Sequence, residues 1–323
     1  MGLSLLLLCA AASALVAFAT SALVGLGLWV GAGRIARLTA AARARVLLGA
    51  ALLPALTCAA VMTAALAPSF GWIVDHCTHS LDAHLHPHLC AHHVSVLPAW
   101  TSLALAGLFL ARLAVSAGRA WRDGHRLHAT RHALTALTPA PARDGLAVLP
   151  FEAPQAFVVG LIKPKIFVTR GLLSGPNREH LAAVLSHERA HVRRRDPLRR
   201  LGASLALGFH LPGLAAWLEA RLARAHEMAA DADAARELRS PECVARALVR
   251  LARTRRLALA PALAFGHSDV EARVAALLDP RPRQDQPQAS VLIAGVAVLL
   301  ALVTVTAGPV HHAVEIALGF VNG

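Results

Sequence analysis

The placement of the basic residues is the feature that most constrains this chain. All 32 lysine and arginine residues lie within 34–45 or 112–283. Four apolar runs lie in or beside the segments that lack such residues, at 3–30, 46–67, 100–115 and 290–307. Each run is about long enough to cross a hydrocarbon core about 30 Å thick, because a helix rises about 1.5 Å per residue. The pattern predicts a membrane protein with four spans.

Composition agrees with membrane integration, and charge sets the expected topology. The 323 residues are 56% hydrophobic and only 16% charged, which is unusual for a soluble enzyme. Lysine and arginine favour the cytoplasmic side of a bacterial inner membrane. Segments 34–45 and 112–283 are therefore expected on that side, and both termini are expected on the external side. The net charge of +13 then reflects residues beside the membrane and argues against direct nucleic-acid binding. A cleaved signal peptide is disfavoured because no basic residue precedes the first run.

The apolar segment 201–217 decides on which side the rest of the basic section lies. It contains His210 and Pro212 near its middle and has arginines on both flanks. If it crossed the membrane, the arginines that follow would lie outside, against the charge asymmetry of the other spans. We therefore expect a hairpin bent at HLPG that either dips into the bilayer or covers a soluble domain.

The expected organisation has three parts. Residues 1–117 hold three spans and an external loop at 70–97, residues 118–285 form a cytoplasmic domain, and residues 286–323 form the fourth span and a short external tail. After the third run, the chain continues as a basic amphipathic segment that is expected to lie along the membrane surface, with Trp121 at the interface.

A small sheet followed by helices is predicted in the cytoplasmic domain. LAVLPF, QAFVVGLI and KIFVT are rich in β-branched and aromatic residues and are separated by prolines, as is typical of strands. QAFVVGLI or KIFVT could be the edge strand on which an extended substrate binds. SGPN then offers Ser174 or Asn177 as the cap of a helix over 178–194. Further helical segments are expected over 218–238 and within 244–278.

The expected helix over 178–194 contains the string HERAH. His187 and His191 are four residues apart, so they share one helix face and can bind one Zn²⁺. Glu188 lies beside them, where it can accept a proton from a water activated by the metal. A catalytic zinc site needs a third protein ligand, and Glu227 in HEMAAD is the candidate on a following helix.

Two aspartates are candidates for orienting the ligand histidines. Asp231 lies four residues after Glu227 on the same helix face, and Asp196 lies five residues after His191. Histidines that bind a metal usually donate their other ring N–H to such a carboxylate. Surface salt bridges with the many nearby arginines are the alternative for both aspartates.

Stabilisation of the oxyanion requires another donor. The chain has no tyrosine, so the donor is expected to be a histidine, an arginine or a backbone N–H. The histidine candidates are His226, His210 and His267. His180 lies about 10 Å along the helix from His187, which is too far to bind the same ion.

These segments together resemble a known family. QAFVVGLIKPKIFVTRGLLS, HLAAVLSHERAHVRRRDPL, ARAHEMAADADAA and the later SDVEARVAALLDP are similar to the protease domain of the BlaR/MecR-type antirepressor membrane metallopeptidases. The resemblance implies a multi-pass α-helical membrane protein with a cytoplasmic α+β gluzincin-like zinc metallopeptidase domain. It implies that His187, His191 and Glu227 bind one zinc ion, that Glu188 is the general base, and that the substrate is a cytoplasmic repressor of the winged-helix type.

Other functions stay open. The external penicillin-binding sensor domain of that family has no counterpart here, so sensing of β-lactams through it is not expected. Membrane proteases of the CAAX-processing and heat-shock types share the signature, which makes quality control of membrane proteins an alternative. A non-catalytic membrane receptor or scaffold is a second alternative. Neither the inducing signal nor the oligomeric state is predicted.

The external loop contains DHCTHSLDAHLHPHLCAHH. Cys77 and Cys90 would face an oxidising compartment, so a disulfide is expected there. A sharper hypothesis is that the loop histidines bind an extracellular transition metal, because histidine-rich tracts are typical of metal binding. These histidines are His76, His79, His84, His86, His88, His92 and His93.

Overall fold

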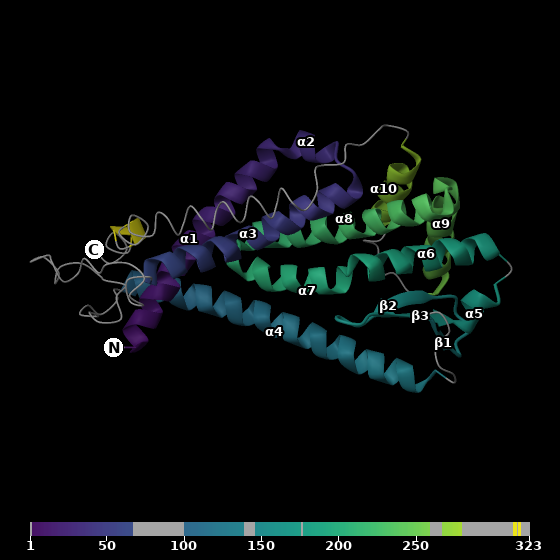
Figure 1. Cartoon of the computed structure of the whole chain (residues 1–323), viewed down its shortest axis with the longest axis horizontal. Helices are drawn as coiled ribbons and strands as arrows, with labels where there is room; N and C mark the ends of the chain where they lie inside the picture. Colours follow the sequence, from purple (N-terminus) through teal and green to yellow (C-terminus); the bar gives the residue numbers. More distant parts are fainter. Residues whose placement is uncertain are drawn as a thin grey trace, which may run out of the picture.

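The structure is a computed structural model, and it describes most of the chain (Figure 1). The described residues are 2–66, 100–138, 146–175, 177–258, 267–279, 313–314 and 316–317. The fourth expected span and the external loop, with its predicted disulfide and metal ligands, lie outside these residues. The described elements are α1 (Gly2–Val30), α2 (Ala32–Ala36), α3 (Ala40–Leu66), α4 (Trp100–Ala136), β1 (Leu146–Leu149), β2 (Ala156–Val159), β3 (Lys165–Thr169), α5 (Arg170–Leu173), α6 (Arg178–Arg194), α7 (Asp196–Ala206), the 3₁₀ helix η3 (Leu207–Phe209), α8 (Pro212–Leu238), α9 (Pro241–Ala258) and α10 (His267–Leu278).

Three described helices are long and apolar enough to cross a membrane. They are Leu3–Val30 of α1, Ala40–Leu66 and Trp100–Ala136, and they correspond to the first three expected spans. Small side chains such as Ala11, Ala65 and Ala106 are fully buried between them. Small residues let apolar helices approach closely, which is how helices associate where water supplies no driving force.

Helix α4 differs from the expectation for the third span. The chain does not turn along the membrane surface after the apolar run, but continues as one helix to Ala136 (Figure 1). Leu127 and Leu134, in its basic half, pack beside Phe157 and Phe167 of the sheet. The apolar stripe of this amphipathic segment is therefore covered by the sheet, and one helix joins the third candidate span to it.

The three-stranded sheet has the order β1-β3-β2. β1 is parallel to β3, and β2 is antiparallel to it. KIFVT forms β3 and is the central strand, so the expectation that it could bind substrate as an edge is wrong. Phe167 is fully buried in a cluster with Leu127 and Leu134 of α4, and Val168 is fully buried in a cluster with Val184 and Leu185 of α6. Of the two strands considered, only β2 lies at an edge, and it packs against α6.

The segment 196–238 reverses direction at His210 and Leu211. Helix α7 and η3 lead to this reversal, and α8 returns from it (Figure 1). The tip lies among the candidate spans, where Phe209 makes an edge-to-face contact with Phe109 of α4 at 5.5 Å between ring centroids. Arg112 of α4 donates a hydrogen bond to the His210 carbonyl at 2.6 Å. Arg112 precedes Trp121 by nine residues, so the hairpin tip that it contacts lies about 13 Å along α4 from Trp121, toward the apolar half of the helix.

His210 is fully buried at this tip and pairs with polar groups of two candidate spans. Its Nδ1 lies 3.1 Å from Ser21 Oγ on α1, and its Nε2 lies 3.2 Å from the Ala51 carbonyl on α3. The ring also interacts with the Ala50 carbonyl, which lacks its usual helical donor because Pro54 has no N–H. His210 thus satisfies backbone groups at the proline site.

The hairpin brings both halves of the expected metal site to one end of the bundle. Helix α7 begins next to the HERAH helix, and α8 runs back to the same region before it reaches Glu227. The return helix packs on α3 through Leu218 and Leu222, beside Leu47. His191 and Glu227 are therefore on the same side of the candidate spans.

Candidate metal centre

Helix α6 positions the two histidines of HERAH. The Asn177 side chain caps it by accepting a hydrogen bond from the His180 N–H at 2.9 Å, so Asn177 rather than Ser174 is the cap. Buried Val184 and Leu185 hold the helix against the sheet in one apolar cluster. His187 lies on the side that faces α8.

His187, His191 and Glu227 converge as a possible ligand set. Each offers a ligand atom within 4.8 Å of the others. The two Nε2 atoms lie 3.1 Å apart, and the Glu227 carboxylate oxygens lie 3.6 Å from His187 Nε2 and 3.8 Å from His191 Nε2. Tetrahedral zinc with ligands at about 2.0–2.1 Å places ligand atoms about 3.3 Å apart. The spacing therefore fits one Zn²⁺ ion.

Both expected aspartates lie against the outer nitrogens of these histidines. Asp231 Oδ1 is 2.8 Å from His187 Nδ1, and Asp196 Oδ2 is 2.8 Å from His191 Nδ1. Both aspartates are buried. A carboxylate at Nδ1 favours the tautomer with the proton there, which leaves the Nε2 lone pair for a metal.

The left-handed backbone of Arg195 explains how Asp196 reaches His191. Arg195 has φ 53° and ψ 39°, which ends α6 and turns the chain directly into α7. A non-glycine residue in this region is uncommon and costs energy. The conformation places Asp196 at the start of α7, where its carboxylate points back at the histidine.

Arg273 of α10 is a site residue that the sequence reasoning missed. Its Nε lies 2.7 Å from Asp231 Oδ2 and its Nη2 lies 2.8 Å from Asp231 Oδ1, which makes a bidentate pair. Its Nη1 lies 3.4 Å from Glu227 Oε2. The segment SDVEARVAALLDP contains this arginine, so the resemblance indicated its helix but not its contact.

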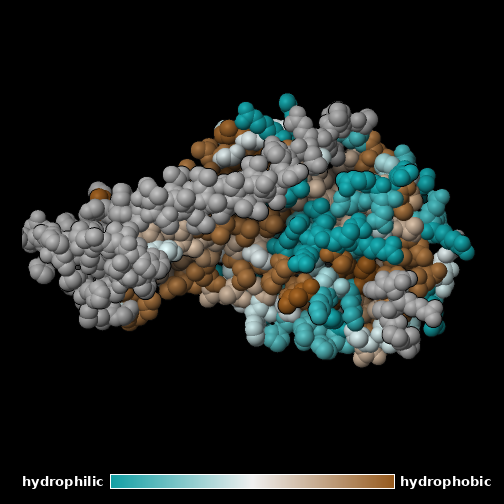
Figure 2. Space-filling model, in the orientation of Figure 1, coloured by the Kyte–Doolittle hydropathy of each residue, from teal (hydrophilic) through white to brown (hydrophobic). Residues whose placement is uncertain are grey.

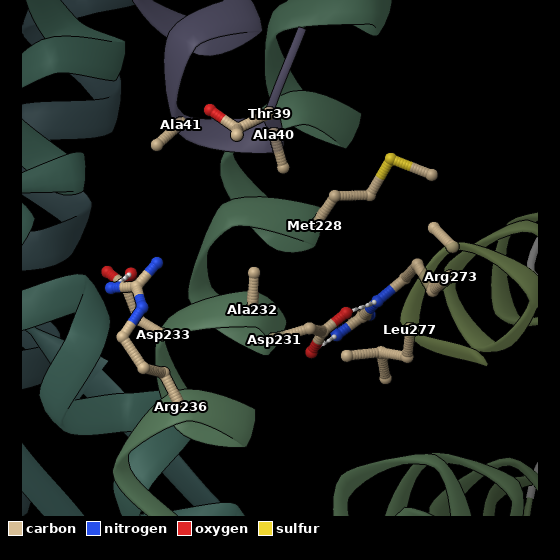
Figure 3. Close-up of a pocket in the computed structure, with 11 residues that line it drawn as sticks. Thr39, Ala40, Ala41, Met228, Asp231, Ala232, Asp233, Arg236, Arg273 and Leu277 are labelled. Atoms are coloured by element: carbon tan, nitrogen blue, oxygen red, sulfur yellow. Dashed lines mark hydrogen bonds and ion pairs between the residues drawn. The ribbon is translucent and has the colours of Figure 1, made fainter. Parts of the chain in front are cut away.

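The Asp231–Arg273 pair forms part of the wall of a small cavity (Figure 3). The cavity measures about 140 Å³ and lies between α8, α10 and the start of α3. Thr39, which precedes α3, and Ala40, its first residue, line the opposite side of the cavity. Asp231 and Arg273, beside the candidate metal ligands, thus lie next to the second candidate span.

The charges in this cluster are strongly coupled. Burial opposes protonation of His187, but Asp231 and Glu227 outweigh it and raise the pKa of His187 to about 9. Burial would raise the pKa of Glu227, but His187 and Arg273 lower it to about 2. Zinc binding would therefore have to displace a proton from His187.

The remaining candidates have different environments. Glu188 follows His187 on α6, is partly exposed and interacts electrostatically with that histidine. His226 is buried, lies 3.9 Å from Asp196 Oδ1, and has its pKa lowered to about 4 by burial. His210 lies at the hairpin tip, about 24 Å along α8 from Glu227, and is therefore not an oxyanion donor. The His267 side chain lies outside the described residues.

The arrangement could hold one catalytic zinc ion, and comparison with known proteins shows similarity to metallopeptidases over part of the chain. Residues 122–221 match the model of peptidase family M48, a range that includes His187, Glu188 and His191 and ends before Glu227. The chain thus carries a segment similar to this family. No solved structure matches the chain.

Two curated relatives are described as homologues of the protease HtpX. The protein from Desulfatibacillum aliphaticivorans is 42% identical over 74 residues, which is 22% of this chain and 24% of the relative. The protein from Thermococcus sibiricus is 39% identical over 66 residues, which is 20% of this chain and 22% of the relative. The chain therefore spans about a quarter of the length of these relatives or less. The matches support a metalloprotease of the M48 type, not the BlaR/MecR family in particular.

Proposed function

We propose that this chain is an integral membrane zinc metalloprotease of the quality-control type. The observation that carries the proposal is the convergence of His187, His191 and Glu227 beside a bundle of three candidate spans. The similarity to HtpX homologues favours quality control over cleavage of a repressor. The charge distribution supports a metal centre on the cytoplasmic side of a bacterial inner membrane, with the termini outside.

The chain's own residues supply most of the chemistry of peptide hydrolysis. A bound zinc ion would act as a Lewis acid toward the peptide carbonyl and the attacking water. Glu188 is placed beside His187 to accept a proton from that water and to pass it to the leaving amine. Asp231 and Asp196 hold the two histidines in the orientation that presents Nε2 to the metal.

The edge strand β2 supports binding of an extended protein segment near HERAH. An extended substrate can add to a free sheet edge through backbone hydrogen bonds, which recognise any unfolded segment. β2 packs against α6, so a strand added there would lie near HERAH. A winged-helix repressor, which the sequence resemblance implied, would have to present such a segment as well.

The test compares Glu188→Gln with the wild-type chain in detergent or in lipid vesicles. The substrate is an unfolded protein, and bound zinc is measured by elemental analysis. We expect Glu188→Gln to keep about one zinc ion per chain and to lose cleavage. Glu179→Gln, at an exposed position in the first turn of the same helix, is the matched control and should cleave normally. Wild-type protein that binds zinc but never cleaves would support the scaffold function instead.

A further inference from the structure

The turn between β2 and β3, residues 160–164, carries an unusually exposed apolar side chain. Gly160 has φ 118°, and a Cβ there would lie 3.1 Å from the Lys163 carbonyl, so a tight turn of this shape requires glycine. Ile162 is 84% exposed. Among the described residues outside the candidate spans, no other large hydrophobic side chain is as exposed. Single exposed apolar residues are common, so its surroundings decide what the exposure means.

This turn lies on α4 just beyond the apolar part of the third candidate span. Leu161 packs at Gly124, where its Cδ1 would be 3.9 Å from an added Cβ. Gly124 follows Trp121 by three residues, which is about 4.5 Å along the helix. Trp121 is 69% exposed, and tryptophan is enriched at the level of the lipid headgroups. The turn and this tryptophan are thus at nearly the same depth.

The charges around the turn suit an anionic surface. Lys163 and Lys165 lie one and three residues after Ile162, and they are the only lysines in the chain. Arg122 and Arg126 are exposed on the neighbouring turns of α4, and Asp123 is the one acidic residue between them. Figure 2 shows a small hydrophobic patch beside strongly hydrophilic side chains where this end of the sheet lies in Figure 1.

We propose that the β2–β3 turn is a lipid-contact site. Ile162 enters the boundary between headgroups and acyl chains, and Lys163 and Lys165 bind the anionic headgroups of the same leaflet. Apolar side chains flanked by basic ones bind membrane surfaces in this way. The contact would anchor one end of the edge strand β2 at the bilayer surface. The inference rests on the proposed membrane integration, and the experiment separates the two.

The experiment measures the depth of a spin label in the full-length chain. The five native cysteines are replaced by alanine, zinc binding is verified, and a label is attached after Ile162→Cys in nanodiscs of phosphatidylcholine and phosphatidylglycerol. Leu108→Cys, on the exposed face of the third candidate span, reports membrane insertion. Phe151→Cys, an exposed apolar position at the opposite end of the sheet, is the matched aqueous control.

Accessibility to oxygen is compared with accessibility to a water-soluble nickel chelate. We expect labels at 108 and 162 to favour oxygen, and the label at 151 to favour the nickel reagent. If the label at 162 favours the nickel reagent, as the label at 151 should, while the label at 108 favours oxygen, the lipid contact is overturned. Membrane integration would still hold in that case. Aqueous behaviour at both 108 and 162 overturns both.

A second comparison tests the role of the lysines. Lys163→Glu with Lys165→Glu should increase exposure of the label at 162 to the nickel reagent several-fold in anionic nanodiscs. Arg246→Glu with Arg178→Glu, at exposed positions on α9 and α6, changes the charge equally and should leave the label unaffected. An equal effect of both double variants would contradict specific headgroup binding.

Discussion

Arg273 and Asp231 form a buried bidentate ion pair, with N–O distances of 2.7 and 2.8 Å, beside the candidate metal ligands. Asp231 in turn contacts His187 Nδ1, and Arg273 lies 3.4 Å from Glu227. The Arg273 guanidinium thus contacts Glu227, a candidate ligand, and also Asp231, the carboxylate beside the candidate ligand His187. It neutralises part of the negative charge that two adjacent carboxylates would otherwise concentrate there.

Replacing this arginine should weaken zinc binding without removing a ligand. Lysine cannot reproduce the planar bidentate contact, so we expect Arg273→Lys to lower the zinc affinity roughly 10-fold and Arg273→Gln to lower it up to about 100-fold. The measurement is competition with a chromogenic chelator. Arg224→Gln removes an exposed ion pair with Asp269 and should change nothing, and an unchanged affinity in Arg273→Gln would show that the pair has no role in orientation.

The contact between Asp196 and His191 makes a separate prediction. Asp196→Asn should reduce zinc affinity about 10- to 100-fold, because the amide is a weaker acceptor for the His191 N–H. Glu179→Gln, in the first turn of α6, removes an exposed contact with Arg246 and serves as the control. If both variants lower the zinc affinity by the same small factor, Asp196 does not orient His191 and serves only in salt bridges.

Zinc affinity should depend on pH through His187. Its pKa is raised to about 9, so in the metal-free protein a proton must leave before zinc binds. We expect the apparent dissociation constant to fall about tenfold per pH unit between pH 7 and 9, and to level off above that. Glu227 does not contribute to this slope, because its lowered pKa of about 2 keeps it ionised throughout. Calorimetry in two buffers with different ionisation enthalpies should detect the released proton. A zinc affinity that does not change between pH 7 and 9 would contradict the loss of a proton from His187.

The hydrogen bonds of His210 predict a coupling with Pro54. His210→Ala removes the imidazole contacts with the Ala50 and Ala51 carbonyls and with Ser21 Oγ, which keeps only the Leu211 N–H, and should lower the stability by about 1–3 kcal/mol. Pro54→Ala restores an N–H donor for the Ala50 carbonyl, so loss of the imidazole should cost less in that background. Thermal midpoints in detergent for the four members of the cycle measure this coupling. Strictly additive effects would mean that the histidine does not serve the proline site.

The sequence by itself determined the local features of this protein. The basic-free apolar runs identified three helices that can span a membrane, and proline-separated runs of β-branched residues identified all three strands. The four-residue spacing of His187 and His191 predicted that both face one candidate metal site, and their Nε2 atoms lie 3.1 Å apart. These features follow from helix and strand periodicity, which depends only on neighbours in the chain.

Only the tertiary structure decided which distant residues meet. The order of the strands made KIFVT central and β2 the edge, because strand pairing is a long-range choice that composition does not encode. The sequence predicted that the basic half of α4 lies along the membrane surface, but the sheet covers Leu127 and Leu134 there. Nothing in the sequence distinguished Arg273 from the many other arginines of the chain. Its role depends on the packing of α10 against α8, which desolvates one guanidinium and pairs it with Asp231.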